Sequence, residues 1–302
     1  MKAIKIAYIL FAICLAALVS CDPFEGSQTV PSYLQIDGIS VVDTPDHSWS
    51  QNEGFFSSQI DAVQITLYQE GDAAETILGT FQLPCKVPVL REGSMKYLRI
   101  TPVVRQNGIA STRIYYPYYK EITINDVSLK ADSTTSLGSL LTQYQPQTKV
   151  VWHEFFEPAQ LTISLDTTVE RIVREPDTVL SGQGCGVVRV KSDQVEVNFW
   201  TDTTFSVYDP SAYLYLELDY WSDFDFSVGM KCMNTNTNSE DIQSAMTIYQ
   251  SKTPGWNKMY INLGRTWSWF NHYPTFRLYF TVFNAEGREG KLLLDNMKLL
   301  TI

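Results

Sequence analysis

Short segments in which apolar and polar residues alternate, each closed by turn residues, run through almost the whole chain. In residues 61–68 (DAVQITLY), for example, the aliphatic residues alternate with polar ones, so that one face of a strand would be apolar. Turn sequences such as Gln106-Asn107-Gly108 separate these segments. No stretch shows the sustained 3.6-residue periodicity of an amphipathic helix. The pattern therefore predicts an all-β chain.

Two successive groups of predicted strands divide the chain. About seven fall within residues 33–145, a number and spacing typical of an immunoglobulin-like β-sandwich. A polar segment with a proline, TQYQPQTKV at 142–150, follows them. About nine more strands fall within residues 150–302, which predicts a jelly-roll β-sandwich. A chain of 302 residues is long enough for each domain to bury its own core.

The composition limits the kinds of partner. The formal net charge is −10, and the sequence contains no basic stripe with interleaved aromatic residues, so nucleic acid is not an expected partner. Aromatic residues make up 13% of the chain and charged residues 19%, a mixture that suits β-rich packing.

Residues 1–20 have the form of a lipoprotein signal peptide. Two lysines precede an apolar run from Ile6 to Val19 that is too short to cross a bilayer comfortably. The sequence that ends it, Leu18-Val19-Ser20-Cys21, resembles the bacterial lipobox, which implies cleavage before Cys21 and acylation of its thiol. Several acyl chains on Cys21 would anchor the protein in the outer membrane. The alternative is an ordinary secreted protein with a chance cysteine.

Residues 21–32 are polar and contain glycine and proline, as expected of a tether between the lipid and the folded body. Asp22 and Glu25, close behind the lipidated position, resemble the export signals of surface lipoproteins in the Bacteroidota. The sequence leaves open whether the body faces the cell surface or the periplasm.

Segments from both halves resemble one family of Bacteroidota lipoproteins. They include PSYLQIDGISV and NGIASTRIYYPYYKE in the first half, and YLELDYWSDFDFSVGM and LLLDNMKLL in the second. The resemblance covers nearly the whole mature chain and implies an N-terminal immunoglobulin-like module followed by a jelly roll of the carbohydrate-binding type. This family is described by its architecture more than by an activity.

The sequence HEFFE at residues 153–157 is similar to the H-E-x-x-H motif of metalloproteases but lacks the second histidine. Two ligands four residues apart face the same way only on a helix, and the surrounding β pattern with Pro158 argues against a helix here. A strand is therefore expected, with the odd-numbered residues on one face and the even-numbered residues on the other.

A calcium site follows from the resemblance. Jelly rolls of the carbohydrate-binding type often hold a structural calcium ion where the first strand meets the last, and the matching residues here are Glu157 and Asp295. Calcium prefers hard oxygen ligands such as carboxylates. The alternative is that Glu157 is an exposed edge charge and Asp295 a turn-forming residue.

The cysteines of the mature chain give no clear signal beyond Cys21. Cys85, Cys185 and Cys232 match no zinc motif. A disulfide between Cys185 and Cys232 and a set of buried free thiols both remain open.

Catalysis of glycoside hydrolysis would need two carboxylates, and the segment YLELDYW offers Glu217 and Asp219 on one strand face. Polar residues on the solvated face of a sheet explain this pair without any chemistry. The sequence has no G-x-S-x-G motif and only three histidines. The chain is therefore not expected to be an enzyme, and glycoside hydrolase is the weakest of the hypotheses.

Aromatic residues are the best candidates for ligand binding, because their rings stack on the apolar faces of sugars. Trp267, Trp269 and Tyr273 fall in the polar, loop-like segment RTWSWFNHYP, and Trp221 and Trp200 lie at the ends of predicted strands. The alternative is that these rings fill the sandwich core or pin a loop.

Together these patterns predict a lipid-anchored cell-envelope protein that binds a glycan or a partner protein and catalyses no reaction. The main alternative is an accessory subunit of an outer-membrane assembly, secretion or uptake complex, in which the jelly roll docks to a barrel protein.

Overall fold

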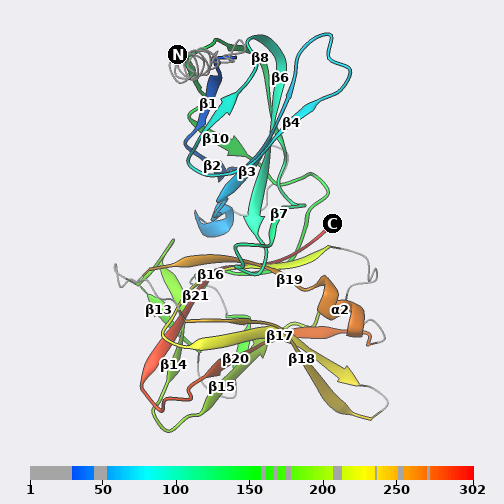
Figure 1. The fold of residues 1–302 in the computed structure, drawn as a ribbon. Helices are drawn as coiled ribbons and strands as arrows, with labels where there is room; N and C mark the ends of the chain where they lie inside the picture. Colours follow the sequence, from blue (N-terminus) through cyan, green and yellow to red (C-terminus); the bar gives the residue numbers. More distant parts are fainter. Residues whose placement is uncertain are drawn as a thin grey trace, which may run out of the picture.

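A computed structural model shows a chain built almost entirely of β-strands, which confirms the predicted all-β fold class (Figure 1). The residues that it describes are 29–43, 53–157, 161–165, 169–173, 178–206, 213–234, 237–250, 255–270 and 273–302. Cys21, the predicted signal peptide and most of the predicted tether lie outside this part of the chain. Within it, no helix is long and apolar enough to cross a membrane.

The N-terminal half forms three small sheets. Its elements are β1 (Ser32–Ile36), β2 (Gly38–Val41), the 3-10 helix η1 (Glu53–Phe56), β3 (Ala62–Tyr68), β4 (Thr76–Gln82), β5 (Cys85–Val89), β6 (Gly93–Arg105), β7 (Arg113–Tyr115), β8 (Ile122–Leu129), β9 (Thr134–Ser136) and β10 (Ser139–Thr142). The largest sheet has the order β4-β3-β6-β7, with β8 also paired to β6. The others have the orders β5-β1-β9 and β10-β2.

The C-terminal half is a sandwich of two sheets. Its elements are β11 (Lys149–Glu154), β12 (Ile163–Leu165), β13 (Val169–Val173), β14 (Gly184–Val190), β15 (Glu196–Thr201), β16 (Leu214–Ser222), β17 (Asp225–Asn234), β18 (Ser239–Ile248), β19 (Asn257–Asn262), the helix α2 (Gly264–Phe270), β20 (Phe276–Phe283) and β21 (Gly290–Thr301). We call the sheet β13-β14-β21-β16-β19, to which β11 is added through β21, the interface sheet. We call the sheet β12-β15-β20-β17-β18 the outer sheet. Figure 1 shows the N-terminal half resting on the interface sheet, with the outer sheet on the far side of the sandwich.

Alternate side chains of β16 point to opposite faces of the interface sheet, so that the strand contributes to two apolar cores. Leu214, Leu216 and Leu218 point into the main core between the two sheets. Tyr215 points the opposite way and packs in a second apolar core with residues of the N-terminal half. Because this second core contains side chains from both halves, the two halves are packed against each other through buried surface.

The HEFFE segment is a strand only as far as Glu154, where β11 ends, and Phe156 has a positive φ of 56°. On β11, Trp152 and Glu154 are buried and His153 is exposed. Beyond the strand end, Phe155 packs in the core shared with the N-terminal half, and Phe156 packs in the main core. The Glu154 carboxylate accepts a hydrogen bond from the main-chain N–H of Phe156 (2.8 Å), which is a structural role. The metalloprotease interpretation therefore has no support in the geometry.

One segment differs from the prediction. Residues 264–270, expected to be a loop, form the short helix α2. The Asn262 side chain accepts a hydrogen bond from the main-chain N–H of Gly264 (2.9 Å), as an N-capping residue does. Leu263 and Trp267, four residues apart, both pack in the main core and fix the helix at the edge of the sandwich.

Cys85, Cys185 and Cys232 form no disulfide with one another in the described part of the chain. Cys185 packs with Val187 and Leu293 on the outward side of the interface sheet, whereas Cys232 lies in the main core. The alternative of a Cys185–Cys232 disulfide is therefore excluded by their positions.

Candidate functional site

A buried cluster of charged and tyrosine side chains lies between the two halves. At its centre is Glu217 of β16, which is fully buried. Its carboxylate lies 3.0 Å from the Lys298 ammonium and accepts hydrogen bonds from the hydroxyl groups of Tyr116 (2.9 Å) and Tyr144 (3.0 Å). Because the two tyrosines belong to the N-terminal half, this cluster joins the halves.

Burial and ion pairing act in opposite directions on the charges of the cluster. Burial raises the pKa of Glu217, but Lys298 and Lys258 more than offset this effect and hold that pKa below its usual value. Burial lowers the pKa of Lys298 to about 8, although Glu217 opposes the shift. The Lys298 ammonium also donates hydrogen bonds to the Tyr144 hydroxyl (2.8 Å) and to the main-chain carbonyl of Phe55. Each buried charge thus lies close to a charge of opposite sign.

The position of Glu217 and Asp219 corrects their interpretation from sequence. They share one face of β16, as expected, but the N-terminal half covers that face, so that neither carboxylate is solvated. Asp219 accepts hydrogen bonds from the hydroxyl of Ser57 (2.5 Å) and from the side-chain amide of Asn296 (2.8 Å). A glycoside has no access to this pair, which therefore does not support hydrolase activity.

The two residues predicted to bind calcium contact the same loop. The Glu157 carboxylate accepts a hydrogen bond from the main-chain N–H of Gln183 (2.8 Å), and the Asp295 carboxylate accepts one from the Ser181 hydroxyl (3.3 Å). Asp295 is 1% exposed and forms no ion pair with any described residue.

Hard oxygen atoms around a buried, uncompensated carboxylate suit calcium. Among the described residues, no group of three His, Cys, Asp or Glu side chains could hold a metal. Further ligands would therefore have to be the Ser181 hydroxyl or main-chain carbonyls. The site remains a prediction.

The structure separates the four aromatic residues predicted to bind a ligand. Trp267 is 2% exposed and packs 4.9 Å from the ring of Phe276, so it belongs to the core and offers no face to a ligand. Tyr273 is also buried, and its hydroxyl donates a hydrogen bond to Asp241. Trp221 is half-buried on the outward side of the interface sheet. These three do not form one site.

Trp269 differs from the other three because its indole is 72% exposed. It lines a hollow at the edge of the outer sheet, together with Ser244 of β18 and Arg265 of α2. No other aromatic ring packs against it among the described residues. An exposed tryptophan beside polar groups is a typical ligand contact.

Ser244, which lines the hollow at Trp269, is also the last residue of a row that crosses the outer sheet on its solvent side. Strand pairing places Trp200 of β15 opposite Tyr279 of β20, Tyr279 opposite Gly229 of β17, and Gly229 opposite Ser244 of β18. We call these four residues and Trp269 the aromatic row. From Trp200 to Ser244 the row crosses three strand spacings, about 14 Å at ~4.8 Å each.

At one end of the aromatic row, the rings of Trp200 and Tyr279 stack with their centroids 6.2 Å apart and their planes 11° apart. Both side chains are half-buried. The ammonium group of Lys231 lies 4.2 Å from the centroid of the Trp200 ring, a cation–π contact that fixes one side of the pair.

Gly229 adds no side chain to the middle of the aromatic row. A Cβ at this position would lie 2.1 Å from the main-chain carbonyl oxygen of Gln243, because β18 is bulged there and approaches closely. Only glycine fits, because the main chain of β18 occupies the place of a side chain.

A second row, parallel to the first, is polar. It contains Asn198, Thr281, Ser227 and Thr247, which strand pairing places side by side. The Thr281 hydroxyl donates a hydrogen bond to the side-chain carbonyl of Asn198 (2.7 Å). The Ser227 hydroxyl makes no hydrogen bond with the described residues, and Ser227 is 8% exposed.

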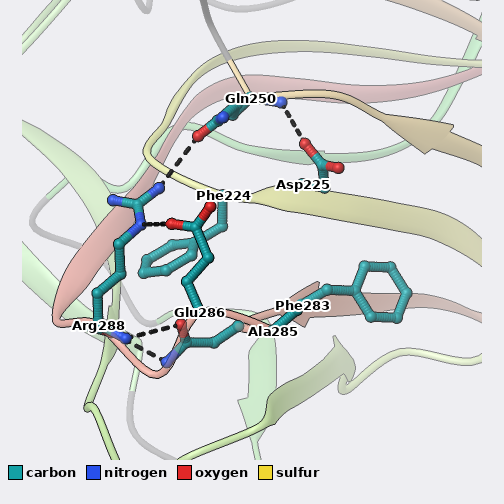
Figure 2. Close-up of a pocket in the computed structure, with 8 residues that line it drawn as sticks. Phe224, Asp225, Gln250, Phe283, Ala285, Glu286 and Arg288 are labelled. Atoms are coloured by element: carbon teal, nitrogen blue, oxygen red, sulfur yellow. Dashed lines mark hydrogen bonds and ion pairs between the residues drawn. The ribbon is translucent and has the colours of Figure 1, made fainter.

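Figure 2 shows a separate pocket at one end of the outer sheet. The Arg288 guanidinium lies 4.6 Å from the centroid of the Phe224 ring and contacts Glu286 (2.9 Å) and the side chain of Gln250 (3.0 Å). The Asp225 carboxylate accepts a hydrogen bond from the main-chain N–H of Gln250 (2.7 Å). Because these polar groups satisfy one another, the pocket is better explained as a packing feature of the loops.

Sequence reasoning named Trp200 only as a residue near a strand end and did not name Tyr279. The signal was present: in NFW (198–200) and RLY (277–279), the aromatic residue follows the alternation on the polar side of its strand. A large ring on the polar face of a strand is a mark of binding, but the pairing of two distant strands was needed to bring these rings together.

Comparisons with known proteins find similarity at the level of three-dimensional structure. No protein-family model matches the chain, and no curated protein matches it. A carbohydrate-binding module from the β-sandwich superfamily covers 78% of this chain and 84% of its own, with 14% identity and a TM-score of 0.37. A xylan-binding domain from CBM 22 covers 51% and 96%, with 10% identity and a TM-score of 0.35. The family 11 carbohydrate-binding module from Clostridium thermocellum covers 50% and 94%, with 13% identity and a TM-score of 0.31. Similarity at this level carries no information on what the present chain binds.

Proposed function

We propose that this chain is a non-catalytic, lipid-anchored protein of the cell envelope that binds a glycan across the outer sheet. The aromatic row is the observation that carries the proposal. It combines ring surfaces at Trp200, Tyr279 and Trp269 with Gly229, which adds no side chain between them. Aromatic faces bind the apolar faces of sugar rings, and the hydroxyl groups of the adjacent polar row suit the sugar hydroxyls.

Absence of catalysis is part of the same proposal. The carboxylates of Glu217 and Asp219 are buried between the halves and paired with lysines. Lipid anchoring rests on the signal-peptide pattern and on Cys21. Replacement of Cys21 by Ser should move the protein from the membrane fraction to the soluble fraction, and protease treatment of intact cells would distinguish a surface location from a periplasmic one.

Affinity electrophoresis of the full-length protein through gels that contain different polysaccharides tests glycan binding. Trp269→Ala should lower the affinity for the polysaccharide about tenfold, which is ~1.4 kcal/mol. The variant should remain folded, because Trp269 is exposed. Tyr115→Ala is a matched control, since Tyr115 is 54% exposed but lies on β7 of the N-terminal half.

Two results would contradict the proposal. One is retardation that is unchanged in Trp269→Ala and in a second variant, Tyr279→Ala. The other is the absence of binding to any polysaccharide together with co-purification of an outer-membrane barrel protein from detergent extracts, which would favour the accessory-subunit alternative.

A further inference from the structure

Most of the described arginine side chains form ion pairs with carboxylates, but two do not. The structure describes the side chains of eight arginines, and six of them form ion pairs with Asp or Glu: Arg91, Arg99, Arg105, Arg113, Arg189 and Arg288. The other two, Arg265 and Arg277, form no ion pair with any described residue. Both border the aromatic row.

Arg277 lies beside the stacked rings. It precedes Tyr279 by two residues on β20, so both side chains point to the solvent side of the outer sheet. Strand pairing places it opposite Lys231, the cation that contacts the Trp200 ring. Arg265 lies at the other end of the row, where it lines the same hollow as Trp269. Three cations therefore follow the row from end to end.

The carboxylates near these cations already have partners. Glu240 pairs with Lys231 (2.7 Å), and Asp241 accepts the hydroxyl hydrogen of Tyr273. Further along the same side of the sheet, Glu196 accepts a hydrogen bond from Asn198 (3.1 Å), and Asp225 accepts one from the main chain of Gln250 (2.7 Å). None of these carboxylates neutralises either arginine.

We propose that the glycan bound by the aromatic row is anionic, carrying carboxylate or sulfate groups that Arg277 and Arg265 bind. This inference rests on the proposed function and adds the class of ligand. Guanidinium groups bind carboxylate and sulfate oxygens through two parallel hydrogen bonds, which fixes the orientation of a sugar while its ring stacks on an aromatic face.

The negative charge of the whole chain means that an anionic glycan can bind only where cations offset the repulsion locally. With a formal net charge of −10, the protein repels polyanions in general. Without local cations, an aromatic row on such a protein would select neutral glycans. The guanidinium groups of Arg277 and Arg265 would instead favour anionic glycans over neutral ones at the aromatic row. Binding of an anionic glycan should therefore weaken as salt is added.

The test uses the full-length protein and two matched pairs of polymers. Polygalacturonate is compared with the same polymer after its carboxylates are reduced to alcohols, and dextran sulfate is compared with dextran. We expect at least one anionic polymer to bind ten times or more as tightly as its neutral counterpart at low salt. Arg277→Gln and Arg265→Gln should each reduce this binding about tenfold.

Arg189→Gln is the matched control, because it removes an exposed guanidinium from the interface sheet. Equal binding of the anionic and neutral members of both pairs would overturn the inference and leave the proposed function standing. Anionic binding that is unchanged in both arginine variants, or equally reduced in Arg189→Gln, would also overturn it. Binding of no glycan at all would refute the proposed function itself. Tight binding of the carboxylated or the sulfated polymer supports the inference and identifies which anion is recognised.

Discussion

Replacement of Glu217 by Gln is the most direct test of the contact between the two halves. Glutamine keeps the shape and can still accept hydrogen bonds from the two tyrosines, but it removes the carboxylate that lies 3.0 Å from the buried Lys298 ammonium. Loss of one partner of a buried ion pair costs about 3–5 kcal/mol. The folded protein can avoid an unpaired charge by releasing the Lys298 proton. From an unfolded pKa of 10.5, this costs about 5 kcal/mol at pH 7 and about 2 kcal/mol at pH 9.

The cost of releasing the Lys298 proton sets an upper limit on the destabilisation, and this limit falls as the pH rises from 7 to 9. Glu217→Gln should lower the free energy of unfolding by about 3–5 kcal/mol at pH 7 and by about 2 kcal/mol or less at pH 9. The folded pKa of Glu217 lies below its unfolded value of 4.5. Its stabilising contribution is therefore complete above about pH 4.5 and is lost as the pH falls through the folded pKa, a loss that the variant should not show. Urea unfolding followed by tryptophan fluorescence and circular dichroism measures both effects.

Two further variants make the result interpretable. Glu170→Gln removes one partner of an exposed pair with Arg189, in which both side chains are more than half exposed, and should change stability by less than about 0.5 kcal/mol. Glu217→Gln combined with Lys298→Met removes both buried charges and should recover much of the loss. A cost below about 1 kcal/mol for Glu217→Gln at pH 7, or a cost that does not fall towards pH 9, would refute this account of the cluster.

Three other substitutions test separate parts of the structure. Trp267→Ala should lower the free energy of unfolding by about 3–5 kcal/mol in the same urea titration, because Trp267 is buried. Trp269→Ala should lower it by less than about 1 kcal/mol, because Trp269 is exposed. Similar losses in the two variants would contradict the placement of Trp267 in the core and of Trp269 outside it. Calcium should raise the melting temperature of the wild type and have no effect on Glu157→Ala or Asp295→Ala; an undiminished calcium effect in both variants would exclude the predicted site. Gly229→Ala should lower the melting temperature, because its Cβ would lie 2.1 Å from a main-chain oxygen of β18, and an unchanged value would show that the bulge yields without cost.

The all-β fold and the faces of individual strands could be predicted because the period of two is local information. The alternation that places His153 outward and Trp152 inward is visible in a few consecutive residues. The same alternation assigns Glu217 and Asp219 to one face, but it cannot reveal that another part of the chain covers that face. Their burial depends on Tyr116 and Tyr144, about 70–100 residues away.

The misassignment of Trp267 has a different cause. Residues 264–270 were expected to form a loop, whereas in the helix α2 residues two positions apart lie about 200° apart around the axis, at 3.6 residues per turn. Seven residues are too few to show helical periodicity, so the helix α2 was missed, and Trp267 and Trp269 were expected to act together. The capping residue Asn262 and the spacing of Leu263 and Trp267 were the only local signs of the helix.

The buried contact between the halves also determines how the binding surface is presented. In a chain anchored at Cys21, as proposed, the N-terminal half lies between the lipid and the sandwich, and the outer sheet forms the side of the sandwich away from it (Figure 1). Such a protein would hold the outer sheet at a fixed distance from the N-terminal half, because the two halves share a buried core. A long polymer could then lie across the distal surface without touching the bilayer, and the height at which it is held would be set by the fold rather than by a flexible linker.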